Sequence, residues 1–328
     1  MPVYKPANFQ IFNTKTKDVK MTKRLFIFAG YDRDKIVDST LVYYLKSLSE
    51  LGDIVFTMDN DLPPHELNKI TEIPNVLHAS AVRHGEYDFG SYKRGYIWAR
   101  DNKLLNKYDW VYLVNDSVLG PLFDLKCTLE KLEASGADLT GMASCQQKYV
   151  PLHIQSWFVG VSKGVVNADF FADFITSVTH QPEKMRIVFK YEVKMSQLIL
   201  NRGYRISTVF GPIDGDYIYE NLYGVIQNGV PFIKKYGLKN LYITDLLWSY
   251  LDEDTILSVI NYAKRHGVDL GNEPIVTPYK KAYQFSLLGI PLISIHHRYC
   301  HGFHQYKGFL FDRIPCFKTL KHEPQPEK

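Results

Sequence analysis

Short apolar runs alternate with amphipathic segments along the first 210 residues of the chain. Residues 24–29 (RLFIFA), 54–58 (IVFTM) and 110–114 (WVYLV) have the pattern of buried strands, and each is followed by a polar loop. Between the first two runs, leucines recur at helical spacing over residues 41–51. Strands that alternate with helices form parallel sheets, because each helix carries the chain back across a face of the sheet. We therefore predict an α/β fold with a mostly parallel central sheet flanked by helices.

Length and charge limit the domain organisation and the partners. The 328 residues are 45% hydrophobic, which is enough for a large core. The formal net charge of +4 is too small and too evenly spread for a nucleic-acid-binding protein, so we expect no nucleic-acid partner. We expect a polar N-terminal extension at residues 1–23, one catalytic domain at 24–264, and a helical or irregular C-terminal arm at 265–328. The arm mixes aromatic and basic residues, which suits either a membrane contact or a subunit contact.

The sequence carries no sign of secretion or of a membrane span. The four cysteines, Cys127, Cys145, Cys300 and Cys316, lack the spacing of a zinc site or a disulfide framework. The N-terminal residues lack the apolar stretch of a signal peptide, and the longest apolar run, residues 285–295, is too short to cross a bilayer. We expect a protein of the reducing cytosol that is soluble or peripherally bound to the membrane.

Polar residues stand at the predicted ligand-binding edge of the sheet. Ligands of open α/β sheets bind beyond the carboxyl ends of the strands, so residues at this edge are candidates for ligand binding. These candidates are Tyr31, Asp32, Asp59, Asp88, Gly90, Asn115 and Asp116. Neither GxGxxG after the first strand nor GxxxxGK[ST] occurs, which argues against a dinucleotide site and a P-loop. A nucleotide-diphosphate ligand would fit this edge.

The segment Asn115-Asp116-Ser117 directly follows the clearest apolar strand. A carboxylate there can offer an oxygen ligand to Mg²⁺ or Mn²⁺, and the ion can bridge a leaving diphosphate. The same residue types are common turn formers, so the segment alone leaves both interpretations open. Among the C-terminal histidines, His301 is a candidate for completing the metal shell, although such histidines more often lie at surfaces or interfaces.

Two charged residues are predicted near the starts of helices. Lys93 falls in the first turn of the helix that follows Asp88-Phe89-Gly90. A cation is unfavourable there unless an anion binds, so Lys93 suggests a phosphate ligand. Glu192 starts an amphipathic helix and is a candidate general base that deprotonates an acceptor hydroxyl. The alternatives are a solvated basic patch for Lys93 and helix capping for Glu192.

Five segments in order resemble a known family. They are DFGSYK, YDWVYLVNDSVLGP, HIQSWFVGVSK, YEVKMSQLILNRGY and NGVPFIKKYGLK. Together they resemble the rhamnan synthesis protein F family of bacterial polysaccharide glycosyltransferases, over roughly residues 24–240. The resemblance implies a GT-A-like nucleotide-diphospho-sugar transferase fold. It also implies a metal-assisted, inverting transfer of rhamnose or a related deoxysugar to a cell-surface polysaccharide or lipopolysaccharide O-antigen.

The resemblance implies a role for each matching residue. The Asp88–Gly90 turn and Lys93 would contact the donor nucleotide or its phosphates. Asn115-Asp116 would be the counterpart of the Asp-x-Asp metal motif, and Glu192 would be the catalytic carboxylate. Asparagine stands in place of the first aspartate of the usual motif, which lowers the charge of the site.

The expected substrates follow from this mechanism. The donor would be dTDP-rhamnose or another UDP- or GDP-sugar, held with Mn²⁺ or Mg²⁺. Trp157 and Tyr217 are candidate acceptor platforms because sugars stack on aromatic rings, although core packing explains each equally well. The acceptor would be a polysaccharide or a lipid-linked glycan, which places the protein at the inner face of the cytoplasmic membrane. The alternatives are a non-catalytic glycan-binding or scaffold subunit and a transferase that uses a UDP-hexose.

Overall fold

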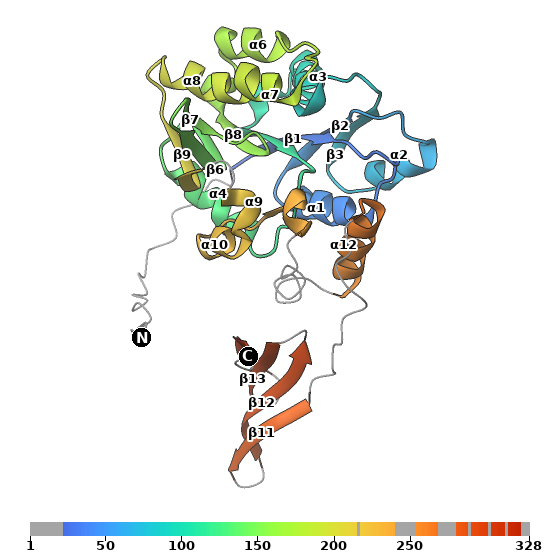
Figure 1. The fold of residues 1–328 in the computed structure, drawn as a ribbon, viewed down its shortest axis with the longest axis vertical. Helices are drawn as coiled ribbons and strands as arrows, with labels where there is room; N and C mark the ends of the chain where they lie inside the picture. Colours follow the sequence, from blue (N-terminus) through green and yellow to red (C-terminus); the bar gives the residue numbers. More distant parts are fainter. Residues whose placement is uncertain are drawn as a thin grey trace.

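The computed structural model describes most of the chain. The described residues are 22–214, 217–239, 253–267, 280–287, 290–300, 303–311 and 314–322. They contain an eight-stranded central sheet with helices on both faces, a two-stranded ribbon and a four-stranded antiparallel sheet (Figure 1). Within these ranges, no helix combines the length and the apolar character that crossing a membrane requires.

The central sheet confirms the predicted α/β architecture. Its strands are β1 (Arg24–Gly30), β2 (Asp53–Met58), β3 (Val76–Ala81), β4 (Trp110–Asn115), β6 (Leu139–Gln147), β7 (Val150–Ile154), β8 (Phe158–Ser162) and β9 (Ile206–Ile213). Their order is β3-β2-β1-β4-β8-β6-β7, and β9 also pairs with β6. The strands β3, β2, β1 and β4 run parallel, and so do β6 and β9. β8 runs antiparallel to both of its neighbours. The carboxyl ends of β1, β2 and β4 therefore meet at one edge of the sheet.

Helices follow the strands along the main body. They are α1 (Ser39–Ser49), α2 (Pro64–Thr71), α3 (Tyr87–Asp101), the 3₁₀ turn η1 (Leu105–Lys107), α4 (Leu125–Ala134), α5 (Lys163–Val166), α6 (Asp169–Thr176), α7 (Lys184–Ile187), the π-helix η2 (Val188–Val193), α8 (Lys194–Leu200), α9 (Tyr217–Glu220), α10 (Leu222–Gln227), the 3₁₀ turn η3 (Lys235–Lys239) and α12 (Glu253–Arg265). α7, η2 and α8 follow one another without a break, so residues 184–200 form one irregular helical segment.

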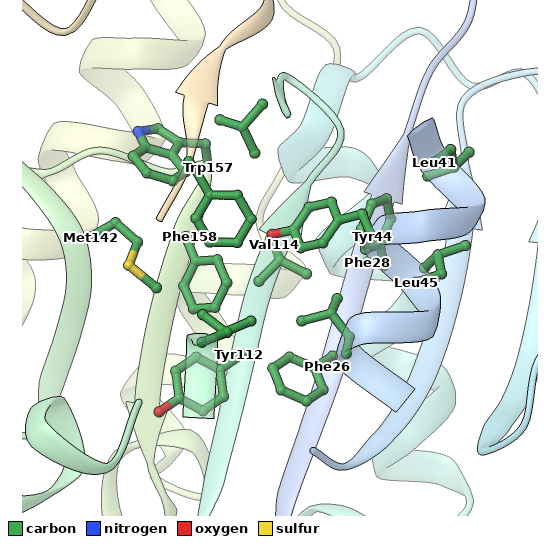
Figure 2. Close-up of a cluster of buried hydrophobic side chains, with 14 of the residues drawn as sticks. Phe26, Phe28, Leu41, Tyr44, Leu45, Tyr112, Val114, Met142, Trp157 and Phe158 are labelled. Carbon is green, nitrogen blue, oxygen red and sulfur yellow. The ribbon is translucent and has the colours of Figure 1, made fainter. Parts of the chain in front are cut away.

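The core lies in two layers, one on each face of the central sheet. Phe26 and Phe28 of β1 belong to a cluster that includes Tyr44 of α1 (Figure 2). Leu25 and Ile27 of the same strand belong to a second cluster, which α3, α6 and α8 share. Successive side chains of a strand point to opposite faces, so an entirely apolar strand supplies both layers. This is why the apolar runs of the sequence do not alternate with polar residues.

A short ribbon joins distant parts of the chain beside the ligand edge. Its strands are β5 (Val118–Leu119) and β10 (Ile233–Lys234), which pair antiparallel with Val118 opposite Lys234. The backbone N–H of Lys235 also donates to the Ser117 carbonyl at 3.0 Å. The ribbon therefore places two lysines next to the loop that follows β4.

The C-terminal segment corrects one expectation. Its described residues form an antiparallel sheet of β11 (Lys280–Leu287), β12 (Ile290–Cys300), β13 (Phe303–Leu310) and β14 (Ile314–His322), in that order. The prediction of a helical or irregular arm is wrong for these residues. Aromatic and β-branched residues recur in the four runs, and Gly289, Gly302 and Asp312 fall between the runs in the sequence, which is a pattern that favours successive strands.

A buried ion pair joins β1 to α4, and breaking this pair tests its contribution to the stability of the core. Arg24 is 7% exposed, and its Nε and Nη2 donate to the two carboxylate oxygens of Glu133 at 2.6 and 2.7 Å. The hydroxyl of Tyr112 donates to the same carboxylate at 2.8 Å.

We expect Arg24→Met to lower the free energy of unfolding by about 3–5 kcal/mol, because it leaves Glu133 charged and buried. Urea unfolding measures the loss. The double variant Arg24→Met/Glu133→Met should recover most of the stability, since it removes both charges. A single variant that unfolds like the wild type would contradict this assignment.

Candidate functional site

A cleft of about 750 Å³ opens at the carboxyl ends of β1, β2 and β4. Its other walls come from the loop between β7 and β8, the segment α7–η2, the ribbon with η3, and the end of α12. The predicted site residues that line it are Tyr31, Asp59, Asp88, Asn115, Asp116, Trp157 and Glu192. Those that do not line it are Asp32, Gly90, Lys93 and Tyr217. His301 lies outside the described residues.

Asp59 holds one wall of the cleft. Its Oδ1 accepts hydrogen bonds from the backbone N–H groups of His84 and Gly85 at 2.7 and 2.8 Å, and its Oδ2 lies 2.8 Å from Nη1 of Arg83. The Arg83 guanidinium lies over the ring of Tyr31, 5.5 Å from its centroid. Tyr31 is 51% exposed, so part of its ring remains available for stacking by a ligand. Asp59 is thus engaged in shaping the loop after β3.

Asn115 organises the loop after β4. Its Oδ1 accepts from the backbone N–H and the hydroxyl of Ser117 at 3.1 and 2.6 Å, and its Nδ2 donates to Oδ2 of Asp88 at 3.1 Å. The amide oxygen is therefore already engaged within the protein. The next residue, Asp116, accepts from the backbone N–H of Tyr31 at 2.9 Å. Burial raises the pKa of Asp116 to about 6, although the nearby Lys235 acts in the opposite direction.

Two carboxylates meet at Ser156. The backbone N–H of Ser156 donates to Oε2 of Glu192 at 2.7 Å, and its hydroxyl donates to Oδ2 of Asp88 at 3.2 Å. Burial, followed by the charge of Glu192, raises the pKa of Asp88. Burial also acts to raise the pKa of Glu192, but hydrogen bonds from His153 and Ser156 outweigh it and hold that pKa below its usual value. The two carboxyl groups thus differ in proton affinity, as the members of acid–base pairs do.

The position of Glu192 differs from the prediction. It lies inside the π-helix η2, between α7 and α8, and not at a helix start. A π-helical turn inserts one extra residue and redirects the side chains around it, and such turns are frequent at functional sites. Here Tyr191 and Val193 are buried in the core, whereas Glu192 reaches the cleft.

His153 supports Glu192 and was not predicted. Its ring is buried, with Nδ1 at 2.9 Å from the Pro151 carbonyl oxygen and Nε2 at 3.5 Å from Oε1 of Glu192. Burial acts against the charged ring, but the two acceptors raise the pKa of His153 overall. Because both ring nitrogens face acceptors, the protonated imidazole suits this position.

Lys234 is the second residue that the sequence did not reveal. It is 8% exposed, and its Nζ donates to the Ser117 hydroxyl at 3.0 Å and lies 5.1 Å from the centroid of the Trp157 ring. Burial lowers the pKa of Lys234 to about 7, although the charges of Glu192 and Asp88 act to raise it. A buried ammonium group that lines a cleft is unusual, because burying a charge is costly unless a partner offsets it. Lys234 falls in NGVPFIKKYGLK, one of the five resembling segments, but that segment does not predict that the β5–β10 pairing brings this side chain to the cleft.

Lys93 and Gly90 serve the packing of α3. This helix begins at Tyr87, so Gly90 lies in its first turn and Lys93 in the next. Nζ of Lys93 lies 2.7 Å from Oε2 of Glu86 and donates to the Val178 carbonyl at 2.7 Å. A side chain at Gly90 would collide with Glu86 and His84. The expected phosphate contact of Lys93 is therefore replaced by an ion pair within the protein.

The two candidate acceptor platforms are packed against other aromatic residues. Trp157 is 2% exposed, and its ring packs against Phe232 while its indole N–H donates to Gln155. Tyr217 packs against Phe210, with ring centroids 5.6 Å apart, and lies away from the cleft. Both rings therefore fit core packing, which the sequence left open as the alternative to an acceptor platform. The tyrosines of α9, η3 and α12 that line the cleft are Tyr219, Tyr236 and Tyr262.

Asp32 fixes α12 against the sheet edge. Its Oδ1 accepts from the backbone N–H groups of Asp34 and Ile36, and its Oδ2 lies 3.2 Å from Nη1 of Arg265. Arg265 also lies 2.9 Å from the carboxylate of Asp38 and 3.3 Å from that of Asp34. Arg265 is the last residue of α12, which carries Tyr262 into the wall of the cleft. Asp32 thus acts on the cleft through Arg265.

We expect Arg265→Met to raise the KM for a substrate that binds in the cleft about threefold to tenfold, because the wall formed by α12 loses its anchor. This corresponds to roughly 1 kcal/mol of lost positioning. The neighbouring Lys264 is exposed, so Lys264→Met is the matched control on the same helix. Steady-state kinetics with varied concentration of that substrate measures the effect, and equal KM values for the two variants would contradict this role of Arg265.

The carboxylates offer a limited metal site. Among the residues that the structure describes, no group of three or more His, Cys, Asp and Glu side chains is arranged to hold a metal ion. Mg²⁺, however, is often held by one or two carboxylates together with substrate phosphates. Asp116 lines the cleft, and burial destabilises its charged form, so a cation beside it would be favourable. Asp116 therefore fits a metal that the donor diphosphate helps to bind.

Known proteins resemble the chain to different degrees. The uncharacterized protein y4gN of Sinorhizobium fredii (strain NBRC 101917 / NGR234) is 22% identical over 286 residues, which cover 86% of this chain and 71% of the relative. Two crystal structures of the glycosyltransferase GlyE of Streptococcus pneumoniae TIGR4 match 76% of this chain with a TM-score of 0.37, at 15% identity for the apo form and 12% for the other. The chain spans 64% and 65% of those two chains, respectively.

A family model matches about two thirds of the chain. The model described as rhamnan synthesis protein F matches residues 54–270. This stretch includes β2 and β4, the Asp88 and Glu192 carboxylates, and the ribbon strand with Lys234. The mostly parallel central sheet flanked by helices is consistent with the GT-A-like fold that the resemblance of the sequence implied. Because the match covers well over half of its residues, this chain belongs to the rhamnan synthesis protein F family.

Proposed function

We propose that the protein is a glycosyltransferase that moves rhamnose or a related deoxysugar from a nucleoside-diphosphate donor to a hydroxyl of a bacterial cell-surface polysaccharide or O-antigen. Membership of the rhamnan synthesis protein F family supports a glycosyltransferase of polysaccharide synthesis. One observation carries the proposed chemistry: Asp88 and Glu192 share Ser156 in a cleft that Lys234 also lines. Carboxylates suit the deprotonation of an acceptor hydroxyl, and an ammonium group suits a leaving diphosphate.

The donor would lie along the carboxyl edge of the sheet. Its nucleoside would pack near the exposed ring of Tyr31 and the guanidinium of Arg83, which line the cleft. Its diphosphate would lie toward Lys234 and Lys235, which enter the same cleft from the ribbon and η3. A divalent ion, Mn²⁺ or Mg²⁺, bound by Asp116 and the phosphate oxygens, would supply further positive charge against the leaving group.

The transfer step would be a single displacement with inversion. The acceptor oxygen forms a bond to the anomeric carbon, and the bond from that carbon to the diphosphate oxygen breaks with its electron pair leaving on the diphosphate. The hydroxyl proton moves to the Asp88–Glu192 pair. The raised pKa of Asp88 favours it as the final proton acceptor, and the partners of Glu192 favour a role in charge and orientation. Lys234 would offset the charge that develops on the leaving diphosphate.

A donor screen tests the proposal. The purified protein is incubated with dTDP-rhamnose, UDP-hexoses or GDP-sugars, with a polysaccharide or lipid-linked acceptor, in Mn²⁺, Mg²⁺ or EDTA. We expect release of the nucleoside diphosphate and a product whose anomeric configuration is inverted, as measured by NMR. Turnover with a UDP-hexose alone would change the donor assignment. A protein that neither turns over any donor nor binds UDP or dTDP in calorimetry would instead be the scaffold subunit.

A further inference from the structure

The segment from α7 through η2 has two different sides. Lys184, Ile187, Val188 and Glu192 line the cleft. Met185 and Phe189 point elsewhere, and they are 57% and 48% exposed. Large apolar side chains exposed together on one helical segment are candidates for contact with a partner surface.

The two exposed apolar side chains lie next to each other. Met185 and Phe189 border one shallow depression, together with Gln181, Glu183, Arg186 and Lys190. Residues four apart on a helical segment lie on one side of it, which agrees with this shared border. The apolar pair therefore forms one patch.

Basic side chains border the patch. Arg186 and Lys190 line the same depression as the apolar pair, and both are exposed. The acidic residue at this depression, Glu183, lies 4.0 Å from Arg186, and both side chains are well exposed. Such an exposed pair contributes little energy, so a net positive charge remains around Met185 and Phe189.

We propose that this face docks the protein on an anionic membrane surface. The basic apolar face consists of Met185, Arg186, Phe189 and Lys190, which border one depression. Exposed apolar side chains that enter the headgroup region and basic side chains that attract anionic lipid are the two contributions that hold interfacial helices on membranes. Each is weak for a patch of this size, and together they give reversible binding.

The position of the basic apolar face in the fold suggests what docking would contribute to the reaction. The same segment supplies one wall of the cleft through Ile187, Val188 and Glu192. Docking would therefore hold the cleft beside the lipid surface. The benefit of holding the cleft there rests on the proposed function, because a lipid-linked acceptor presents its hydroxyl at the lipid surface. This face is not the membrane contact expected from the sequence, which lies in the C-terminal arm.

Vesicle sedimentation tests the proposal with the full chain. The vesicles contain either phosphatidylcholine alone or phosphatidylcholine with about one third phosphatidylglycerol. We expect binding to the anionic vesicles only, weakening as salt rises. The variants Met185→Ser/Phe189→Ser and Arg186→Glu/Lys190→Glu should each lower the partition coefficient at least tenfold.

Matched controls separate this face from general charge and general hydrophobicity. Lys107→Glu/Lys131→Glu changes two exposed lysines on other elements, and Leu77→Ser/Val82→Ser changes exposed apolar residues near β3. Both controls should bind like the wild type. Equal binding to the two vesicle types, or wild-type binding by both docking variants, would overturn the proposal. Turnover of a soluble acceptor should stay unchanged in the docking variants. If the wild type, the controls and the docking variants all fail to turn over this acceptor, the result would instead count against the proposed function.

Discussion

Replacing Asp88 with asparagine will lower kcat/KM for sugar transfer by about 10²- to 10⁴-fold, the usual contribution of a positioned general base. The amide keeps the size of the side chain and the neighbours Asn115 and Ser156, but it cannot accept the proton of the acceptor hydroxyl. Steady-state kinetics with the donor identified by the screen measures the loss. Asp101→Asn, an exposed carboxylate on the same helix, is the matched control and should leave kcat/KM unchanged.

The pH dependence separates the two carboxylates. Asp88 accepts a proton only when it is ionised, so activity falls as the pH drops through its pKa. The charge of Glu192 helps to raise that pKa, and Glu192→Gln removes this charge. The pKa of Asp88 then falls, and the acidic limb of the kcat/KM profile moves to lower pH. A nearly inactive Glu192→Gln beside an active Asp88→Asn would reverse the roles and make Glu192 the base.

The apolar runs of the sequence were sufficient to predict the central sheet. Residues 24–30 of β1 are buried without exception, and β4 is buried along its whole length. Strands of this kind need cover on both faces, which only alternating helices provide in a single chain. The ligand-binding edge of the sheet was predictable for a related reason, because parallel strands bring their carboxyl ends together.

The partners of individual side chains could not be predicted from local sequence. Besides pairing with Glu86, Lys93 donates to the Val178 carbonyl, which lies 85 residues later in the chain. Trp157 sits beside polar residues in the sequence, yet Phe232 and Lys234 cover its ring from the other end of the domain. Such pairings depend on tertiary contacts that no local spacing records.

The π-helix is a feature of the backbone that has no local signature. The π-helix places Glu192 in the cleft, although the sequence around it reads as an ordinary amphipathic helix. The C-terminal strands, in contrast, do have a local signature, because aromatic and β-branched runs alternate with turn-forming residues in this part of the sequence.

Lys234 is the residue on which the charge balance of the cleft depends. Its ammonium group is buried beside Ser117 and faces the charges of Asp88 and Glu192. With a pKa of about 7, it is only partly protonated in the free protein at neutral pH. An incoming diphosphate adds negative charge, which raises this pKa and draws a proton onto the lysine. Donor binding near pH 7.5 should therefore take up a fraction of a proton, on the order of one half.

Lys234→Met should lower kcat by about 10²- to 10³-fold, the effect of removing one group that stabilises developing charge. It should also abolish the proton uptake, which calorimetry of dTDP or UDP binding in buffers of different ionisation enthalpy measures. Methionine fits the apolar contacts with Trp157, and an unchanged thermal unfolding temperature would show that the loss is chemical. Lys46→Met, at an exposed position of α1, is the control. Wild-type proton uptake in Lys234→Met would place the diphosphate elsewhere, because another group would then accept the proton.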